Sequence, residues 1–257
     1  MAYADVVLAD SPVYYFRMNE PGGVASASIG ADPTTYLVAG EETLTTDNCS
    51  GVVSNYTGVA QNGGSFLLVQ SGHMWANSRQ SFSSVTAMTL EAWVAVVSGP
   101  GNGSGASRVM FSWGFEAPAV FVSVFDLSRN LIAQMQDNTS ANHSQTYQTT
   151  PGYLQDGAFH HLALSIGLTT TTLYLDGAAL SPSITAVPTS WSLVSVGYAA
   201  MNLGHYNPTL GNHAGIFYSE VAFYNSALSS TRVAAHYAAR EVTGRPRWRS
   251  GLPGVCQ

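Results

Sequence analysis

Carboxylate groups are the first candidates for chemistry, because a pair of them can hydrolyse a glycosidic bond. A retaining glycosidase needs the pair about 5 Å apart, and a strand supplies this when acids lie at i and i+2 or i and i+4. Glu91 has no second acid at either spacing, and the adjacent Glu41 and Glu42 would point to opposite faces of an extended strand. The other acids of the central region are isolated: Glu116, Asp126, Asp137 and Asp156. The pattern predicts no glycosidase and makes Glu91 a structural acid bonded within a sheet.

Nucleophilic and zinc chemistry find little support either. The chain has no G-x-S-x-G motif, and its two cysteines, Cys49 and Cys256, have no metal-ligand spacing and are predicted to be unpaired thiols. His160 and His161 are neighbours on a predicted strand, so we expect both to be packing residues, one facing the core and the other solvent. His205 and His213 lie at the two ends of a loop rich in Gly, Asn and Pro, but no third zinc ligand is nearby.

The composition excludes several further function classes. Only 9% of the 257 residues are charged, against about 25% in typical soluble domains, and none of them is lysine. A P-loop lysine, a Schiff base and a lysine-rich nucleic-acid face are therefore impossible. We expect no nucleic-acid partner and a largely neutral surface that forms hydrogen bonds through hydroxyl and amide groups.

The elements that must position any site are mostly short strands. Apolar and polar residues alternate over five segments, which are separated by turn-forming residues and predict an all-β sandwich or jelly roll. Asp176 and Gly177 predict a hairpin turn. A short helix is predicted over Tyr3–Leu8, and a later one within Ser226–Arg240, with Ser229 as N-cap and Val233 and Tyr237 on its buried stripe. The five predicted strands are Met88–Val97, Ala119–Phe125, Asn130–Gln136, His160–Ile166 and Thr171–Leu175.

The charge distribution divides the chain into a body and an arm. Residues 1–239 carry 5 arginines against 14 acids, whereas residues 240–257 carry 4 arginines against Glu241 alone. The sequence thus predicts one domain over residues 1–239 and an extended basic arm over 240–257. The arm could dock on an acidic surface of an assembly or could be a solvated tail. Its candidate assembly contacts are Arg245, Arg247, Trp248 and Arg249.

Membrane insertion and export are not expected from the sequence. No apolar stretch approaches the roughly 18 residues that a spanning helix needs. The first residues have no basic group before a short apolar run, which Asp10 interrupts, so they do not form a secretory signal. We expect a protein made in the cytoplasm.

Several segments together resemble the laminin-G-like, concanavalin A-like lectin/glucanase jelly roll. Tyr3–Glu20 resembles the opening of the family, and Thr89–Val94 resembles its core strand. Phe159–Leu164 and Leu173–Gly177 resemble its paired central strands, and Ser219–Ser229 resembles its closing strand and helix. The resemblance implies a concanavalin A-like β-sandwich over about residues 3–239.

The same resemblance leads to the functional hypotheses. The opening motif is similar to that of stand-alone members found among tailed-bacteriophage head-surface and minor tail proteins. It implies a non-enzymatic decoration protein on the virion surface, made in the host cytoplasm, whose partners are other virion proteins, copies of itself and a possible glycan. The alternative is a carbohydrate-binding module of a secreted bacterial protein. A glucanase, which would depend on Glu91 or Glu116, is a third class.

Two candidate binding sites accompany this resemblance. Many relatives hold calcium through loop acids near the sandwich rim, and the corresponding positions here leave Asp32 and Glu220, about half of the expected carboxylates. No other cofactor is expected. Sugar binding would use an aromatic ring for stacking and amides for hydroxyl groups, although the same aromatics could instead close one end of the sandwich. The candidate glycan-binding residues are Trp75, Asn77, Asn202, His205, Tyr206 and Asn207.

Overall fold

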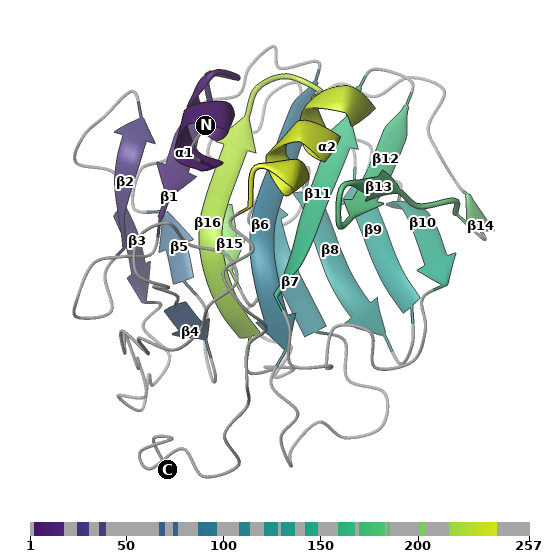
Figure 1. Cartoon of the computed structure of the whole chain (residues 1–257). Helices are drawn as coiled ribbons and strands as arrows, with labels where there is room; N and C mark the ends of the chain where they lie inside the picture. The colour runs from purple at the N-terminus through teal and green to yellow at the C-terminus, as the bar shows by residue number, and fades with distance from the viewer. Residues whose placement is uncertain are drawn as a thin grey trace, which may run out of the picture.

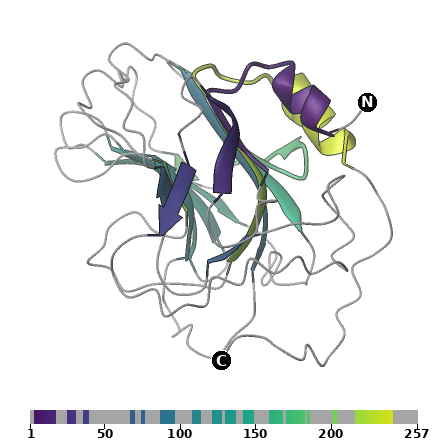
Figure 2. The same ribbon diagram turned by 90° about the vertical axis from the view of Figure 1, so that its left-hand side faces the viewer.

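The computed structural model shows a two-layered β-sandwich with both helices on the outer side of one layer (Figures 1 and 2). The residues that the structure describes are 3–17, 25–30, 36–39, 67–69, 74–76, 87–96, 108–113, 121–127, 130–136, 142–148, 159–167, 170–182, 184–185, 201–203 and 216–240. Within them, the predicted all-β sandwich with an N-terminal and a late helix is confirmed. The predicted extended arm and the domain boundary at residue 239 remain predictions, because residues 241–257 lie outside this part.

The first layer carries the helices and combines strands from near both ends of the chain with strands from its middle. Its central strands are β6 (Met88–Val96) and β16 (Ile216–Tyr224), which pair with each other. From β6 the layer continues through three antiparallel strands: β11 (His160–Ile166), β12 (Thr171–Leu175) and β13 (Ala178–Ala179). On the other side, β16 pairs with β1 (Tyr14–Phe16) and, further along its length, with β4 (Leu67–Val69).

The second layer is formed mainly by the middle of the chain. Strand β2 (Ala25–Gly30) pairs with β1 and with β3 (Tyr36–Ala39), and so joins the two layers. From β3 the order is β5 (Met74–Ala76), β15 (Met201–Leu203), β7 (Arg108–Trp113), β8 (Phe121–Leu127), β9 (Asn130–Gln136), β10 (Asn142–Gln148) and β14 (Ile184–Thr185). The layer thus brings β5 and β15 together, although more than a hundred residues separate them.

Alternation along β6 explains why the first layer is buried on both faces. Leu90 lies on one face, whereas Glu91 and Trp93 lie on the other, and all three side chains are buried. Trp93 belongs to a cluster that includes Tyr3 and Val233 from the two helices, so its face is the one that the helices cover. The opposite face, that of Leu90, is turned toward the second layer. The helices therefore seal a second, outer core.

Both predicted helices are present, and the caps agree with the sequence. Helix α1 spans Tyr3–Leu8 and helix α2 spans Ser230–Ala238. The Ser229 hydroxyl accepts a hydrogen bond from the Arg232 backbone N–H at 3.3 Å, as expected of an N-cap. Val233 is fully buried and Tyr237 partly buried, which confirms the predicted stripe. The stripe also contains His236, which is fully buried.

The hairpin turn at Asp176 and Gly177 is confirmed, since both residues have positive φ angles, +51° and +77°. A Cβ atom added to Gly177 would lie 2.8 Å from Cβ of Tyr237 in α2. We expect Gly177→Ala to lower the free energy of unfolding by about 1–3 kcal/mol, because it adds backbone strain and a steric clash. The matched control is Gly167→Ala, whose nearest contact would be the Thr170 hydroxyl at 3.1 Å. Chemical denaturation that gave equal losses for the two variants would contradict this prediction.

Candidate functional site

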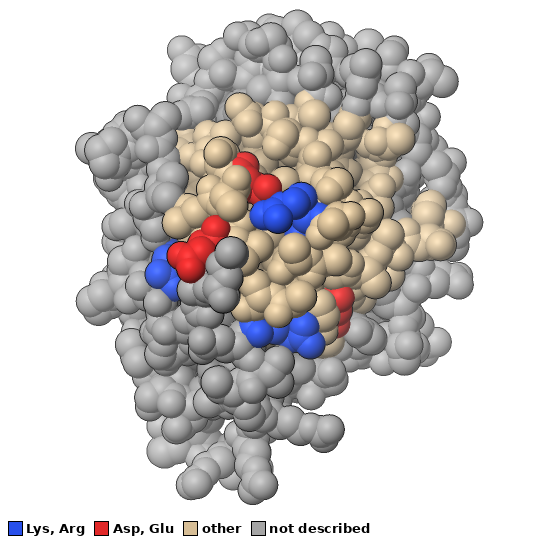
Figure 3. All heavy atoms as spheres, turned by 45° about the horizontal axis from the view of Figure 1, so that its top comes forward, with Lys and Arg blue, Asp and Glu red and all other residues tan. Residues whose placement is uncertain are grey.

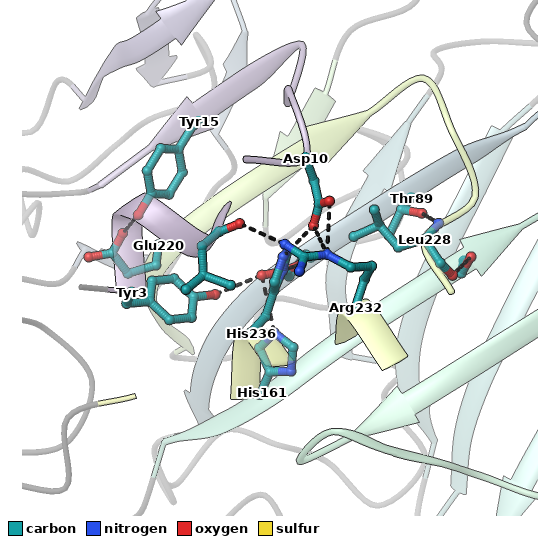
Figure 4. A network of polar contacts seen from close by, with 12 residues as sticks. Tyr3, Asp10, Tyr15, Thr89, His161, Glu220, Leu228, Arg232 and His236 are labelled. Carbon is teal, nitrogen blue, oxygen red and sulfur yellow. Dashed lines mark hydrogen bonds and ion pairs between the residues drawn. The ribbon is translucent and has the colours of Figure 1, made fainter. Parts of the chain in front are cut away.

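The outer core between the helices and the first layer contains a network of charged side chains (Figure 4). Glu91 of β6, only 1% exposed, accepts a hydrogen bond from the Tyr3 hydroxyl at 2.7 Å. Its second oxygen lies 2.8 Å from Nδ1 of His236 in α2. Nε2 of His161 in β11 lies 3.2 Å from Glu91 Oε1 but forms no hydrogen bond there. Glu91 is thus a structural acid, as predicted, but its hydrogen bonds come from both helices and not from the sheet.

The network continues from His236 to the end of helix α1. Nε2 of His236 lies 2.7 Å from Asp10 Oδ2. Arg232, one turn earlier in α2, places its Nε 2.9 Å from both oxygens of Asp10, and its Nη2 donates to the Val6 carbonyl at 3.2 Å. A chain of ionic contacts therefore links β6, α2 and the turn after α1.

Burial and neighbouring charges shift the pKa values within this network. Burial would raise the pKa of Glu91, but the two histidine rings beside it hold that pKa well below its usual value. Burial would lower the pKa of His236, but hydrogen bonds and charge interactions with Glu91 and Asp10 raise it. Both oxygens of Glu91 are occupied by protein groups. This carboxylate holds the helices, and its burial keeps it away from any substrate in solution.

The prediction that one of the two adjacent histidines faces solvent is wrong, because both are buried. His161 lies under α2, with its ring centroid 5.0 Å from that of Trp93. His160 points to the opposite face, where its Nδ1 lies 2.9 Å from Oδ2 of Asp176 in the hairpin turn. Asp176 also accepts a hydrogen bond from the His161 backbone N–H at 3.0 Å. The turn therefore covers the end of the strand and shields His160 from solvent. The packing role expected for both histidines is confirmed.

Glu220, one of the two predicted calcium ligands, occupies an irregular position in β16. The register of β16 against β6 shifts between Ser219 and Ala222, and Glu220 has a φ of +51°. Its carboxylate is 1% exposed, accepts a hydrogen bond from the Tyr15 hydroxyl and lies 3.7 Å from Arg17 Nη2. Asp32 lies outside the described residues, within which no three metal-ligating side chains gather. The calcium site therefore remains a prediction.

The environment of Glu220 predicts a pH effect of its own. Burial outweighs the Tyr15 and Arg17 contacts and raises the pKa of Glu220 to about 7. Between the unfolded value of about 4.3 and pH 7, the folded protein holds a proton that the unfolded chain has lost. The free energy of unfolding should therefore fall by up to about 1.4 kcal/mol per pH unit in this range because of this group.

The variant Glu220→Gln tests this effect, since the amide has nearly the same shape as the protonated acid and does not titrate. We expect its stability to vary less with pH between 4.5 and 7 than that of the original protein. Urea denaturation at four pH values in this range measures the difference. Identical pH profiles for the two proteins would contradict the buried, titrating carboxylate.

The structure brings two of the predicted glycan-binding residues together. Asn202 of β15 is directly opposite Trp75 of β5 in the strand register, although the two were selected from separate segments. Paired positions in neighbouring strands lie on the same face of a sheet. The other four candidates, Asn77, His205, Tyr206 and Asn207, lie outside the described residues, as do the predicted arm contacts Arg245, Arg247, Trp248 and Arg249 and the two cysteines.

The Trp75–Asn202 pair belongs to a longer row across the second layer. Successive register pairs continue the row through four further strands, at Ser112, Ser123, Gln134 and Ser144. Ala133, next to Gln134 in β9, is buried. Because successive positions of a strand alternate between faces, the row lies on the face opposite Ala133. That face carries an aromatic position followed by five positions with amide or hydroxyl side chains.

Charge is sparse on the described surface. Among the described residues in Figure 3, most of the surface is uncharged, and acidic and basic atoms form small mixed patches. The Asp10–Arg232 pair is one such contact. The composition predicted this neutral surface. No helix among the described residues is long and apolar enough to span a bilayer.

Sequence reasoning missed the network around His236, although one signal for it was available. Val233 and Tyr237 were placed on the buried stripe of α2, and His236 lies three residues after Val233, at a spacing that belongs to the same stripe. A histidine in such a position needs polar partners. Asp10 and Glu91 could not be identified as those partners, because they lie 226 and 145 residues away in the chain.

Comparison with known proteins gives the family of this fold. The model of the concanavalin A-like lectin/glucanases superfamily matches residues 69–234, more than half of the chain. None of the curated proteins compared with the chain matches it significantly.

Solved structures of bacterial toxin domains are similar to the chain in fold. The botulinum neurotoxin serotype G binding domain superposes with a TM-score of 0.60 at 12% identity, over 89% of this chain and 51% of that one. The serotype D ligand binding domain in complex with N-acetylneuraminic acid gives 0.58 at 11% identity, over 93% and 52%. The binding domain of Paraclostridial Mosquitocidal Protein 1 gives 0.59 at 13% identity, over 90% and 52%. The chain therefore spans about half the length of these structures.

Proposed function

Because the chain belongs to the concanavalin A-like lectin/glucanase superfamily, we propose that it is a non-catalytic recognition domain that binds glycans. The observation that carries the proposal is the register pair of Trp75 and Asn202, with its row of polar positions across the second layer. Aromatic rings stack on the apolar faces of sugars, whereas amides and hydroxyl groups exchange hydrogen bonds with sugar hydroxyls. A row of uncharged residues with both features suits an uncharged or weakly charged glycan.

The state of Glu91 supports a binding role over a hydrolytic one. Its two oxygens accept hydrogen bonds from Tyr3 and His236 beneath the helices, on the side of the first layer that faces away from the second. A glycosidase acid must reach a substrate in solution. The acid that would have been the first choice for catalysis is thus committed to holding α1 and α2.

A glycan array tests the proposed binding. The full chain is labelled and applied to arrays of neutral β-linked glycans and sialylated glycans. Sialylated glycans are included because one structure of similar fold was solved with N-acetylneuraminic acid. We expect saturable binding to at least one glycan class. A folded protein that binds none of them at high micromolar concentration would overturn the proposal.

We further propose that the domain acts on a bacteriophage virion, as a decoration protein of the head surface or as a minor tail protein. The support is the similarity of the opening segment, Tyr3–Glu20, to that of stand-alone family members among tailed-bacteriophage virion proteins. Tyr3 and Tyr15 of this segment are buried in the fold. The basic arm with Arg245, Arg247 and Arg249 would contact other virion proteins or further copies of this chain.

Mass spectrometry of gradient-purified particles tests the virion location. We expect the chain to co-sediment with particles of the phage that encodes it. If particles lack it while the isolated chain binds glycans, the carbohydrate-binding module of a secreted bacterial protein becomes the better account. If particles contain it and the array is negative, the role on the particle is structural.

A further inference from the structure

His236 is held between two acids that approach opposite sides of its ring (Figure 4). Nδ1 lies 2.8 Å from Oε2 of Glu91, and Nε2 lies 2.7 Å from Oδ2 of Asp10. An ionised carboxylate can only accept hydrogen bonds, and a neutral imidazole carries only one N–H. With both acids ionised, both contacts are hydrogen bonds only if both ring nitrogens carry hydrogen. The lowered pKa of Glu91 and the pairing of Asp10 with Arg232 favour the ionised acids. The geometry therefore favours an imidazolium ion in a fully buried side chain.

The groups that surround this ring balance its charge. Glu91 faces it from β6 and Asp10 from the turn after α1, whereas Arg232 of α2 pairs with Asp10. Tyr3 of α1 and Tyr224 of β16 have ring centroids 6.5 Å and 6.2 Å from that of His236. Burial, followed by the Glu91 charge, raises the pKa values of both tyrosines well above the usual value, so their hydroxyls stay neutral. Nε2 of His161 in β11 lies near Oε1 of Glu91, the oxygen that His236 does not contact.

Loss of the His236 proton would upset this balance. Two carboxylates, Glu91 and Asp10, would then face the single positive charge of Arg232, and one of the two contacts to the ring would lose its donor. A buried charge without a compensating partner is costly. The structure can relieve this cost by opening the helices and admitting water to the acids.

We propose that the His236 proton is a lock that fastens both helices, α1 and α2, to the outer face of the sheet, and that alkaline pH releases them. The two helices contact each other and lie side by side on this face (Figures 1 and 2). Asp10 is the contact from the N-terminal segment, and Glu91 is the contact from the sheet beneath. One proton therefore joins three elements that are far apart in the chain.

The sign of the pH effect follows from the raised pKa of His236. Below about pH 6.5 the ring is protonated in both the closed and the open form, and the lock is fully effective. Above this value, the open form loses the proton first. The opening constant of the helices should then rise up to tenfold per pH unit, until the closed form also loses its proton.

Nuclear magnetic resonance of the full chain, labelled with ¹⁵N in its histidines, tests the lock without any destabilising substitution. We expect both ring nitrogens of His236 to show imidazolium shifts at about pH 7.5, above the usual histidine pKa of about 6.5. The result that would overturn the proposal is a neutral His236 ring at this pH, with one nitrogen unprotonated.

Hydrogen exchange with mass spectrometry then tests whether the proton controls the helices. After correction for intrinsic rates, exchange in peptides from α1 and α2 should accelerate up to tenfold per pH unit above pH 6.5, while β11 peptides remain protected. His236→Gln should open more at pH 6 and lose this pH slope. Asp10→Asn should narrow the pH range of the slope, whereas Asp5→Asn, at an exposed position of α1, should leave it unchanged. Equal slopes in the original protein and in His236→Gln would also overturn the proposal.

Discussion

Replacing Glu91 by Gln is expected to lower the free energy of unfolding by about 3–5 kcal/mol, the usual cost of removing one partner from a buried ion pair. The amide keeps the size of the side chain, but it leaves the buried His236 imidazolium with Asp10 as its only anion. The Tyr3 hydroxyl would also face a neutral acceptor in place of a carboxylate. Urea denaturation at pH 6, where His236 is protonated, measures the loss.

The double variant Glu91→Gln/His236→Gln is the control for this interpretation. If the two residues act as a pair, the double variant should lose less stability than the sum of the two single losses. A loss below about 1 kcal/mol for Glu91→Gln, or strictly additive losses, would contradict the network as the element that holds the helices.

Replacing Trp93 by Ala is expected to cost about 3–5 kcal/mol, because it empties the centre of the outer core. The Trp93 ring stacks with Tyr237 of α2 at a centroid distance of 5.8 Å and meets Tyr3 of α1 edge-on at 6.1 Å. The cavity would therefore lie beneath both helices. Thermal and urea unfolding, followed by circular dichroism, report the loss.

Trp93→Phe is the matched variant, since it keeps an aromatic ring and leaves a smaller cavity. We expect it to lose clearly less stability than Trp93→Ala, in keeping with a cost that grows with the empty volume. Hydrogen exchange should localise the damage in Trp93→Ala to α1, α2 and the strands beneath them. Protection that is lost evenly over the whole sandwich would contradict this location.

The fold was predictable where local signals determine structure. Alternation marked β6, β9, β11 and β12 to within about a residue, the Asp176–Gly177 pair marked the hairpin, and Ser229 marked the start of α2. Each signal depends on residues close together in the chain. The positive φ angles of the turn and the N-cap bond are local consequences of residue type.

The charge network was not predictable, because it depends on long-range register. Asp10 was interpreted only as an interruption of an apolar run, and the position of α2 over β6 brings it to His236. One of the two adjacent histidines was expected to face solvent, but the hairpin turn folds back over His160. Glu220 occupies a bulge in β16, which shifts the register locally and buries the carboxylate against Tyr15. Strand alternation predicts the faces of regular strands and fails at such irregular positions.

The candidate glycan site was predictable only in part. Residue type singled out Trp75 and Asn202 as separate candidates, since one offers a ring and the other an amide. Only the strand order, in which β15 lies between β5 and β7, makes them neighbours. The row that continues from them through Ser112 and Ser123 could not be read from the sequence, because it crosses strands that are distant in the chain.

Isothermal titration of the best array glycan into the Trp75→Ala variant tests glycan recognition most directly. We expect its Kd to rise at least about tenfold relative to the original protein, because the one aromatic position of the row, which would stack on the sugar, is lost. Thr231→Ala, an exposed change on α2 over the other layer, should bind normally. A Trp75→Ala protein that is folded, by circular dichroism, and binds the glycan with unchanged Kd would contradict glycan binding at the Trp75–Asn202 row.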